Sequence, residues 1–281
     1  MPMSSPKRLI TGRIVALTVG VTIALCMIAW GTLNVVALGV SDKISVDRTL
    51  PASENAVSAT IVAGDLSFMP SGDDQVHVSG AVDYHLLQPT VTITRSGAGV
   101  SIDVSCPWSW LVVDACSAHL TVKVPPQLAV TASTVSGNIT ATGLHDISLS
   151  TVSGNITAIG LHGVSLQSTS GGQTVSDIGG TATLNTISGT IRGRTLGASR
   201  VKASDVSGAV SLGFSTAPSN VWVNVTSGSV LVTVPAPSLP YLVTAHSTTG
   251  ATTIGVPTDP SSTHLIAVTT VSGDISVQPA G

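Results

Sequence analysis

The chain has 281 residues and a formal net charge of −3, and 43% of its residues are hydrophobic, 3% aromatic and only 9% charged. About 25% charged residues is typical of globular proteins, so this composition excludes a soluble helical protein whose surface is covered with ion pairs. The high apolar content excludes disorder. Ser, Thr and Gly dominate the polar residues, which favours an all-β fold of short strands joined by tight turns.

The first long apolar stretch lies near the N-terminus and runs from Ile14 to Ser41 without a charged residue. A helix of about 20 apolar residues crosses the core of a bilayer, so the sequence predicts a transmembrane signal anchor over residues 14–40. Three basic residues, the last of them Arg13, precede this segment. The positive-inside rule therefore places this short tail in the cytoplasm and the following chain outside the cell membrane.

The N-terminal segment has two alternative interpretations. Cleavage after Gly39, with Ala37 at the −3 position, would make it a signal peptide, although such peptides have an apolar core of about 7–15 residues. Lipidation of Cys26 is disfavoured because Leu25 precedes it, where a small residue is needed. We therefore predict a cytoplasmic tail (1–13), a transmembrane helix (14–40), a linker (41–56) and one extracytoplasmic domain (57–281). The extracytoplasmic part has 8 basic and 14 acidic residues, which gives no reason to expect nucleic-acid binding.

A repeat occupies the second half of the chain. The heptapeptide TVSGNIT occurs at residues 134–140 and again, unchanged, at residues 151–157. Related Ser-Gly or Thr-Gly turns follow at intervals that grow from 17 to 23 residues. Repeats of this length are typical of solenoids, in which each unit buries its apolar face only against its neighbours. The predicted turn glycines are Gly137, Gly154, Gly171, Gly189, Gly208, Gly228, Gly250 and Gly273.

The pattern within each unit indicates strands. Apolar and polar residues alternate in residues 146–152, DISLSTV, and a unit of 17 residues with a glycine turn has no room for a helix. We therefore predict an all-β, single-stack β-solenoid in which glycine supplies the positive φ or the close backbone approach that each turn needs. Asn138 and Asn155 are expected to form a side-chain ladder. The apolar residues that flank each turn are expected to point inward as the core: Val135, Ile139, Val152, Ile156, Ile187, Ile191, Val206, Val210, Val271 and Ile275.

The segment from Cys106 to Cys116 interrupts this texture. In an exported domain two cysteines at this spacing favour a disulfide, and the alternative is a pair of free thiols. A metal site is disfavoured because the two cysteines and His119 lack a fourth ligand. Trp108 and Trp110 lie between the cysteines, either as local core under the loop or as an exposed contact patch.

Catalytic and metal-binding patterns are weak throughout the sequence. His145 and His162 occupy equivalent positions in adjacent units, and they are interpreted either as a shared metal or pH-sensing site or, preferably, as turn residues on a solvated corner. Only Asp274 is acidic among the residues that follow the eight turns, which disfavours a calcium-binding β-roll or a sugar-cleaving β-helix. Hydrolase and nucleotide-binding motifs are absent. We expect a non-enzymatic protein without catalytic, cofactor-binding or metal-binding residues.

The units TVSGNIT, TISGTIR, DVSGAVS and TVSGDIS, together with LTVKVPPQLAVTASTVSG, resemble the bacterial putative-adhesin family, a domain of unknown function of the 4097 type. The resemblance covers roughly residues 57–277. It implies a β-solenoid at the cell envelope, an adhesive or structural role, no established catalytic residues and, in some relatives, a connection to envelope-stress regulation.

These observations give three hypotheses for function. The leading one is a membrane-anchored binding or scaffolding module that presents a Thr/Ser-rich face to an envelope protein, a glycan or a wall polymer. The second is a regulatory protein that senses the state of the envelope and acts through membrane partners, because a tail of about 13 residues is too short for an output domain. A carbohydrate-active enzyme on a β-helix is the least favoured.

Overall fold

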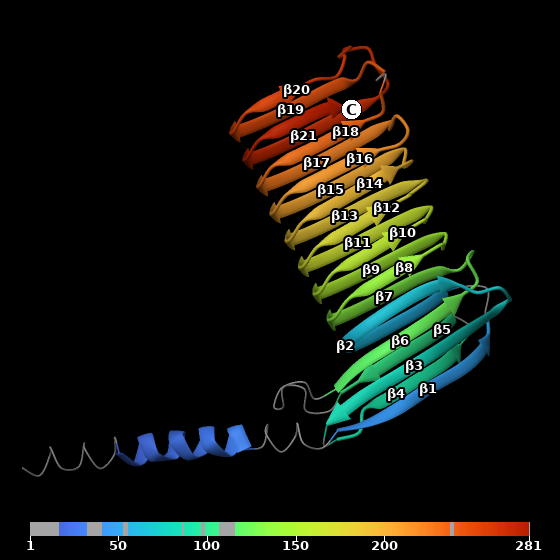
Figure 1. The fold of residues 1–281 in the computed structure, drawn as a ribbon, viewed down its shortest axis with the longest axis vertical. Helices are drawn as coiled ribbons and strands as arrows, with labels where there is room; N and C mark the ends of the chain where they lie inside the picture. Colours follow the sequence, from blue (N-terminus) through green and yellow to red (C-terminus); the bar gives the residue numbers. More distant parts are fainter. Residues whose placement is uncertain are drawn as a thin grey trace, which may run out of the picture.

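The computed structural model describes residues 17–32, 41–52, 56–85, 87–96, 99–106, 116–236 and 239–280. Residues 17–32 form a helix, and the remaining described residues form strands and turns. The strands stack into an elongated column of coils, with the C-terminal coils at the end opposite β1 and β4 (Figure 1).

Six strands form the N-terminal end of the column. They are β1 (Ser41–Pro51), β2 (Ala56–Pro70), β3 (Gln75–His85), β4 (Thr90–Ser96), β5 (Gly99–Ser105) and β6 (Cys116–Val124). β3 runs antiparallel to both β1 and β6, and β4 runs antiparallel to β5. β2 is long enough to serve two sheets: its first half pairs with β5 and β7, and its second half pairs with β6 and β8.

The repeat units form parallel coils, each with one strand in sheet A and one in sheet B. Sheet B contains β7 (Ala129–Ser136), β9 (Asp146–Ser153), β11 (Gly163–Ser170), β13 (Thr181–Ser188), β15 (Arg200–Ser207), β17 (Asn220–Ser227), β19 (Leu242–Thr249) and β21 (Leu265–Ser272). Sheet A contains β8 (Ile139–Thr142), β10 (Ile156–Ile159), β12 (Gln173–Ser176), β14 (Ile191–Leu196), β16 (Val210–Phe214), β18 (Val230–Val234), β20 (Thr252–Ile254) and β22 (Ile275–Pro279). The predicted all-β solenoid is confirmed, and the strands of its repeat units run parallel.

The last two coils do not stack in the order of the sequence. β17 pairs with β21, and β21 pairs in turn with β19. β18 likewise pairs with β22, and β22 pairs with β20. The coil of β21 and β22 therefore lies between the coil of β17 and β18 and the outermost coil, which β19 and β20 form. The colours of Figure 1 also show this order.

Glycines stack directly on one another at the corner where each coil passes from sheet B to sheet A. A Cβ added to Gly154 would collide with the backbone carbonyl of Gly137, and φ of Gly154 is +148°, a value that side-chain-bearing residues rarely adopt. Every predicted turn glycine lies in this glycine column, which also begins one coil earlier than predicted. Its order in space is Gly64, Gly137, Gly154, Gly171, Gly189, Gly208, Gly228, Gly273 and Gly250.

A side-chain ladder runs beside the first part of the glycine column. The backbone N–H of Asn155 donates to Oδ1 of Asn138 at 3.0 Å, and the N–H of Gly172 donates to Oδ1 of Asn155 at 2.9 Å. Asp65 extends the ladder downward, because its Oδ1 accepts from the N–H of Asn138 at 2.9 Å. The predicted Asn138–Asn155 ladder is therefore present, and it ties successive corners together.

The hydrophobic core lies between the two sheets and differs in part from the prediction. The five predicted residues that follow a turn are buried, for example Ile139 and Ile156. The prediction is wrong for the five residues that precede a turn, because they are 47–54% exposed: Val135, Val152, Ile187, Val206 and Val271. The strand alternation explains this difference, because inward positions such as Thr134 directly precede them and the next side chain must face outward.

The structure bears on two of the N-terminal predictions. No helix within the described residues is long and apolar enough to cross a membrane, so the predicted transmembrane helix over 14–40 is not supported. The described helix spans residues 17–32, and residues 1–16 and 33–40 lie outside the described parts of the chain. The predicted linker over 41–56 contains β1, which pairs with β3 along its whole length and buries Val46. Its alternating Ile44 and Val46 are the strand signal that the prediction missed.

The glycine column predicts a specific sensitivity to alanine. Gly154→Ala is expected to lower the free energy of unfolding by about 2 kcal/mol or more, because the new Cβ meets the Gly137 carbonyl and the φ angle becomes strained. Gly213→Ala is the matched control, since its Cβ would lie 3.6 Å from the nearest atom. Urea unfolding followed by circular dichroism measures both. Equal losses in the two variants would contradict the role of the column.

Candidate functional site

A shallow groove runs along sheet B beside the glycine column, crossing the coils of β2, β7, β9, β11 and β13. We call it the corner groove; its volume is about 450 Å³. Its walls are two rows of outward-facing side chains, one polar and one mostly apolar, and no charged residue is among those that line it in the described chain. The polar row is Thr60, Ser133, Ser150, Gln167 and Asn185, and the second row is Val135, Val152, Thr169 and Ile187.

The rows follow from the register of the parallel strands. Ser150 pairs with Ser133 on one side and with Gln167 on the other, so equivalent side chains lie above one another. Neighbouring strands lie about 4.8 Å apart, which sets the spacing of hydroxyl and amide groups along the polar row. Ser133 Oγ donates to Thr60 Oγ1 at 3.4 Å, so part of the row is already linked. The corner groove thus offers a periodic series of neutral donors and acceptors beside an apolar wall.

The floor of the corner groove is a row of buried hydroxyls. Thr134, Thr151, Ser168 and Thr186 face inward one position before the exposed row. Thr151 Oγ1 donates to the carbonyl of Gly137 at 3.4 Å, and Ser168 Oγ donates to the carbonyl of Gly171 at 3.2 Å. These two hydrogen bonds attach β9 and β11 to the glycine column. The hydroxyls of Thr134 and Thr186 have no hydrogen-bond partner among the described residues.

Asp205 continues this inward row as a buried carboxylate. Its Oδ1 accepts from the N–H of Ser207 at 3.0 Å, while its Oδ2 has no hydrogen-bond partner among the described residues. Burial raises the pKa of the Asp205 carboxyl, and the backbone N–H groups of Ser207 and Val206 only partly oppose this shift. No other titratable group in the described part of the chain lies in this row, so Asp205 is its single buried acid.

The two cysteines lie at the N-terminal end of the solenoid. Cys106 follows β5, Cys116 begins β6, and the structure joins them by a disulfide with a Cα–Cα distance of 6.0 Å. Both are buried and belong to the hydrophobic core. Trp108 and Trp110 lie outside the described residues, so their proposed contact patch stays a prediction.

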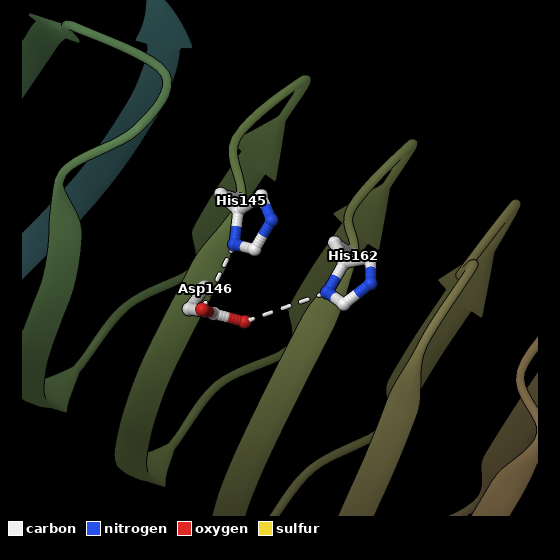
Figure 2. Close-up of side chains that lie close together, drawn as sticks. All are labelled: His145, Asp146 and His162. Carbon is white, nitrogen blue, oxygen red and sulfur yellow. Dashed lines mark hydrogen bonds and ion pairs between the residues drawn. The ribbon is translucent and has the colours of Figure 1, made fainter.

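His145 and His162 lie at the second corner of the coils, where the chain returns from sheet A to sheet B. Their rings stack with centroids 4.4 Å apart, and both are exposed, as turn residues would be. Asp146 lies between their Nδ1 atoms (Figure 2). The sequence prediction missed Asp146, although its equivalent in the next unit is Gly163, a difference that marks this corner.

The prediction from the sequence did not include the corner groove. Its apolar wall was assigned to the core, and its polar row resembles ordinary outward strand residues when each unit is considered alone. The signal that reveals it is the register between units, because Val135, Val152 and Ile187 form a surface only when they are stacked.

Comparisons with known proteins bear on the family and the fold. Residues 58–278 match the family described as Toastrack DUF4097. Three similar solved structures are described as putative adhesins. The Bacteroides fragilis protein is 15% identical with a TM-score of 0.52 and covers 85% of this chain and 98% of its own. The Parabacteroides merdae protein is 16% identical with a TM-score of 0.53 and covers 86% and 95%. The Parabacteroides distasonis protein is 17% identical with a TM-score of 0.51 and covers 84% and 96%.

A search of curated proteins gives no match. The solved structures share the fold with this chain. Their identities of 15–17% do not extend the similarity to individual site residues.

The buried Asp205 predicts a defined pH dependence of stability. Its raised pKa means that the folded state retains the proton to a higher pH than the unfolded chain, whose Asp pKa is about 3.9. Its contribution to stability is therefore fullest below about pH 3.9 and falls as the pH rises through the raised pKa. Asp205→Thr, which copies Thr186 of the neighbouring coil, is expected to remove this fall and to add about 1–3 kcal/mol at pH 7.

Urea unfolding between pH 4 and pH 8 measures this effect. Asp103→Thr is the control, because Asp103 is an exposed carboxylate on β5, and it is expected to change stability by less than about 0.5 kcal/mol. A loss of stability in Asp205→Thr at pH 7 would show that the carboxylate is needed where it lies.

Proposed function

This chain belongs to the Toastrack DUF4097 family, and we propose that it is a non-enzymatic, adhesin-like binding module of the cell envelope whose contact surface is the corner groove. The observation that carries the proposal is the continuity of this groove over five coils, with an uncharged lining and an exposed aliphatic wall. The description of three structural neighbours as putative adhesins is consistent with it.

The exposed apolar wall of the corner groove is the feature that favours a bound partner. Single exposed apolar residues are ordinary, but Val135, Val152 and Ile187 lie in one row that is about half exposed. A bound partner would remove this row from water while it used the hydroxyl and amide groups of the opposite wall. The groove is therefore suited to an extended, uncharged chain that alternates apolar and hydrogen-bonding groups.

An extended segment of a protein fits this description better than a glycan. Sugar rings stack on aromatic side chains, and the described residues that line the corner groove include none. A polypeptide strand instead offers aliphatic side chains to the Val/Ile row and amide groups to the polar row. We therefore propose an uncharged, apolar segment of another envelope protein as the partner.

The disulfide supports a place outside the cytoplasm. Cys106 and Cys116 are joined in the structure, and disulfides persist in oxidising compartments and are rare in the cytosol. The proposal therefore assigns the solenoid to the extracytoplasmic side of the envelope.

Photo-crosslinking in the native cells tests this proposal. A photoreactive amino acid at Val152 of the full chain, in the corner groove, is expected to capture one envelope protein, identified by mass spectrometry. The control is the same substitution at Ile159, which is 39% exposed in sheet A of the same coil and does not line the groove. A charge in the groove should also interfere, so Val152→Asp is expected to lower capture by a probe at Ile187 several-fold, whereas Ile159→Asp should not.

Equal capture from positions 152 and 159, or no capture from position 152, would rule out the corner groove as the contact surface.

A further inference from the structure

Two histidines and one aspartate meet at the corner opposite the glycine column (Figure 2). Nδ1 of His145 lies 2.8 Å from Oδ2 of Asp146, and Nδ1 of His162 lies 3.9 Å from Oδ1 of the same carboxylate. One ligand atom from each residue lies within 4.8 Å of the other two. The described residues contain no other such group of three histidine, cysteine or acidic side chains.

The backbone on both sides holds the two histidines in place. The carbonyl of His145 accepts from the N–H groups of His162 at 3.1 Å and Gly163 at 2.8 Å. The N–H of His145 donates to the carbonyl of Pro126 at 2.9 Å, and the carbonyl of His162 accepts from Gly180 at 2.8 Å. Because each histidine is fixed to the coil above and the coil below, only side-chain rotation is needed to adjust the three ligand atoms.

Two glycines leave room for these side chains. A Cβ on Gly163 would collide with Oδ1 of Asp146, and a Cβ on Gly180 would lie 2.7 Å from Cε1 and 2.9 Å from Nδ1 of His162. Neither glycine has φ in the left-handed region. A Cβ on Gly180 would also lie 2.7 Å from the backbone carbonyl oxygen of His162, whereas a Cβ on Gly163 would meet only the Asp146 side chain. The space that glycine leaves is occupied by the Asp146 carboxylate and the His162 ring, which lie over the next coil.

We propose that His145, Asp146 and His162 form a site for a divalent transition-metal ion of the Zn²⁺ class, a role beyond the proposed function and independent of the corner groove. Two imidazole nitrogens and one carboxylate oxygen are a common donor set for such ions. Ligand bonds of about 2.0–2.2 Å in tetrahedral geometry place two ligand atoms about 3.3 Å apart. The two histidine Nδ1 atoms lie 2.8 and 3.9 Å from the two different oxygens of the Asp146 carboxylate, on either side of that value.

The surroundings leave part of the coordination sphere open. All three side chains are 55–61% exposed. His145 and His162 border a hollow of about 570 Å³ whose lining also includes Gln127 and Asp177. Water can therefore complete the coordination, and the carboxylate of Asp177 adds a second negative charge at the same corner. The Asp146 carboxylate and the two neutral imidazoles leave a bound divalent ion with one net positive charge, which the Asp177 carboxylate offsets.

Isothermal titration of the metal-free full chain with Zn²⁺ alone tests the proposal. The wild-type chain is expected to bind one ion through this site, and His145→Gln, His162→Gln and Asp146→Asn are each expected to lower the affinity about tenfold or more. His119→Gln is the matched control, because His119 is 55% exposed and lies 3.4 Å from the carboxylate of Asp65, but outside any group of three ligands. It is expected to retain the wild-type affinity.

Thermal unfolding gives a second measurement on the same samples. Zn²⁺ is expected to raise the unfolding midpoint of the wild-type chain and of His119→Gln, and to raise that of Asp146→Asn much less, since an ion that binds only the folded state stabilises it according to its affinity. Asp146 is an exposed residue and Asn has the same shape, so this variant tests the site without disturbing the coil. The proposal is overturned if the wild-type chain takes up no Zn²⁺, or if Asp146→Asn and His162→Gln bind it as tightly as the wild type.

Discussion

Backbone contact between glycines at one corner of every coil is the constraint on which the rest of the solenoid depends. Without a side chain at Gly171, its coil approaches that of Gly154 closely enough for backbone hydrogen bonds to cross the corner, such as that from the Gly154 N–H to the Ser170 carbonyl at 3.1 Å. This contact aligns Ser153 with Ser170 and so fixes the register of both sheets. The buried core, the corner groove and the stacked histidines are all rows created by that register.

The sequence predicts the coil better than it predicts the faces of the coil. Alternation and the Ser-Gly turns are local features, so the solenoid, the turn glycines and buried positions such as Ile139 and Ile156 follow from them. The sequence pattern places Val135 and Val152 in the core, because apolar residues usually lie inside. Their exposure depends on the corner: Thr134 and Thr151 take the inward position, and the chain turns at glycine before alternation returns it to the core.

Candidate sites show the same limit, because they are relations between coils and not motifs within one. The equivalence of His145 and His162 is visible in the repeat, yet their proximity to Asp146 depends on the space above Gly163 and Gly180. The corner groove is visible only when Val152 is stacked between Val135 and Thr169. The proposed contact surface therefore lies at one corner of the coils, and the proposed metal site lies at the other.

The end of the glycine column provides the most direct test of this account. There the glycines stack in the order Gly228, Gly273, Gly250, which differs from their order in the sequence. Exposed Asn224 and Thr269 are partners on adjacent strands, whereas His246 lies one strand further. Mild oxidation of the full chain in a Cys26→Ser background is predicted to form a disulfide in Asn224→Cys/Thr269→Cys but not in Asn224→Cys/His246→Cys, whose Cα atoms are about 9.6 Å apart. A disulfide in the second variant and none in the first would contradict it.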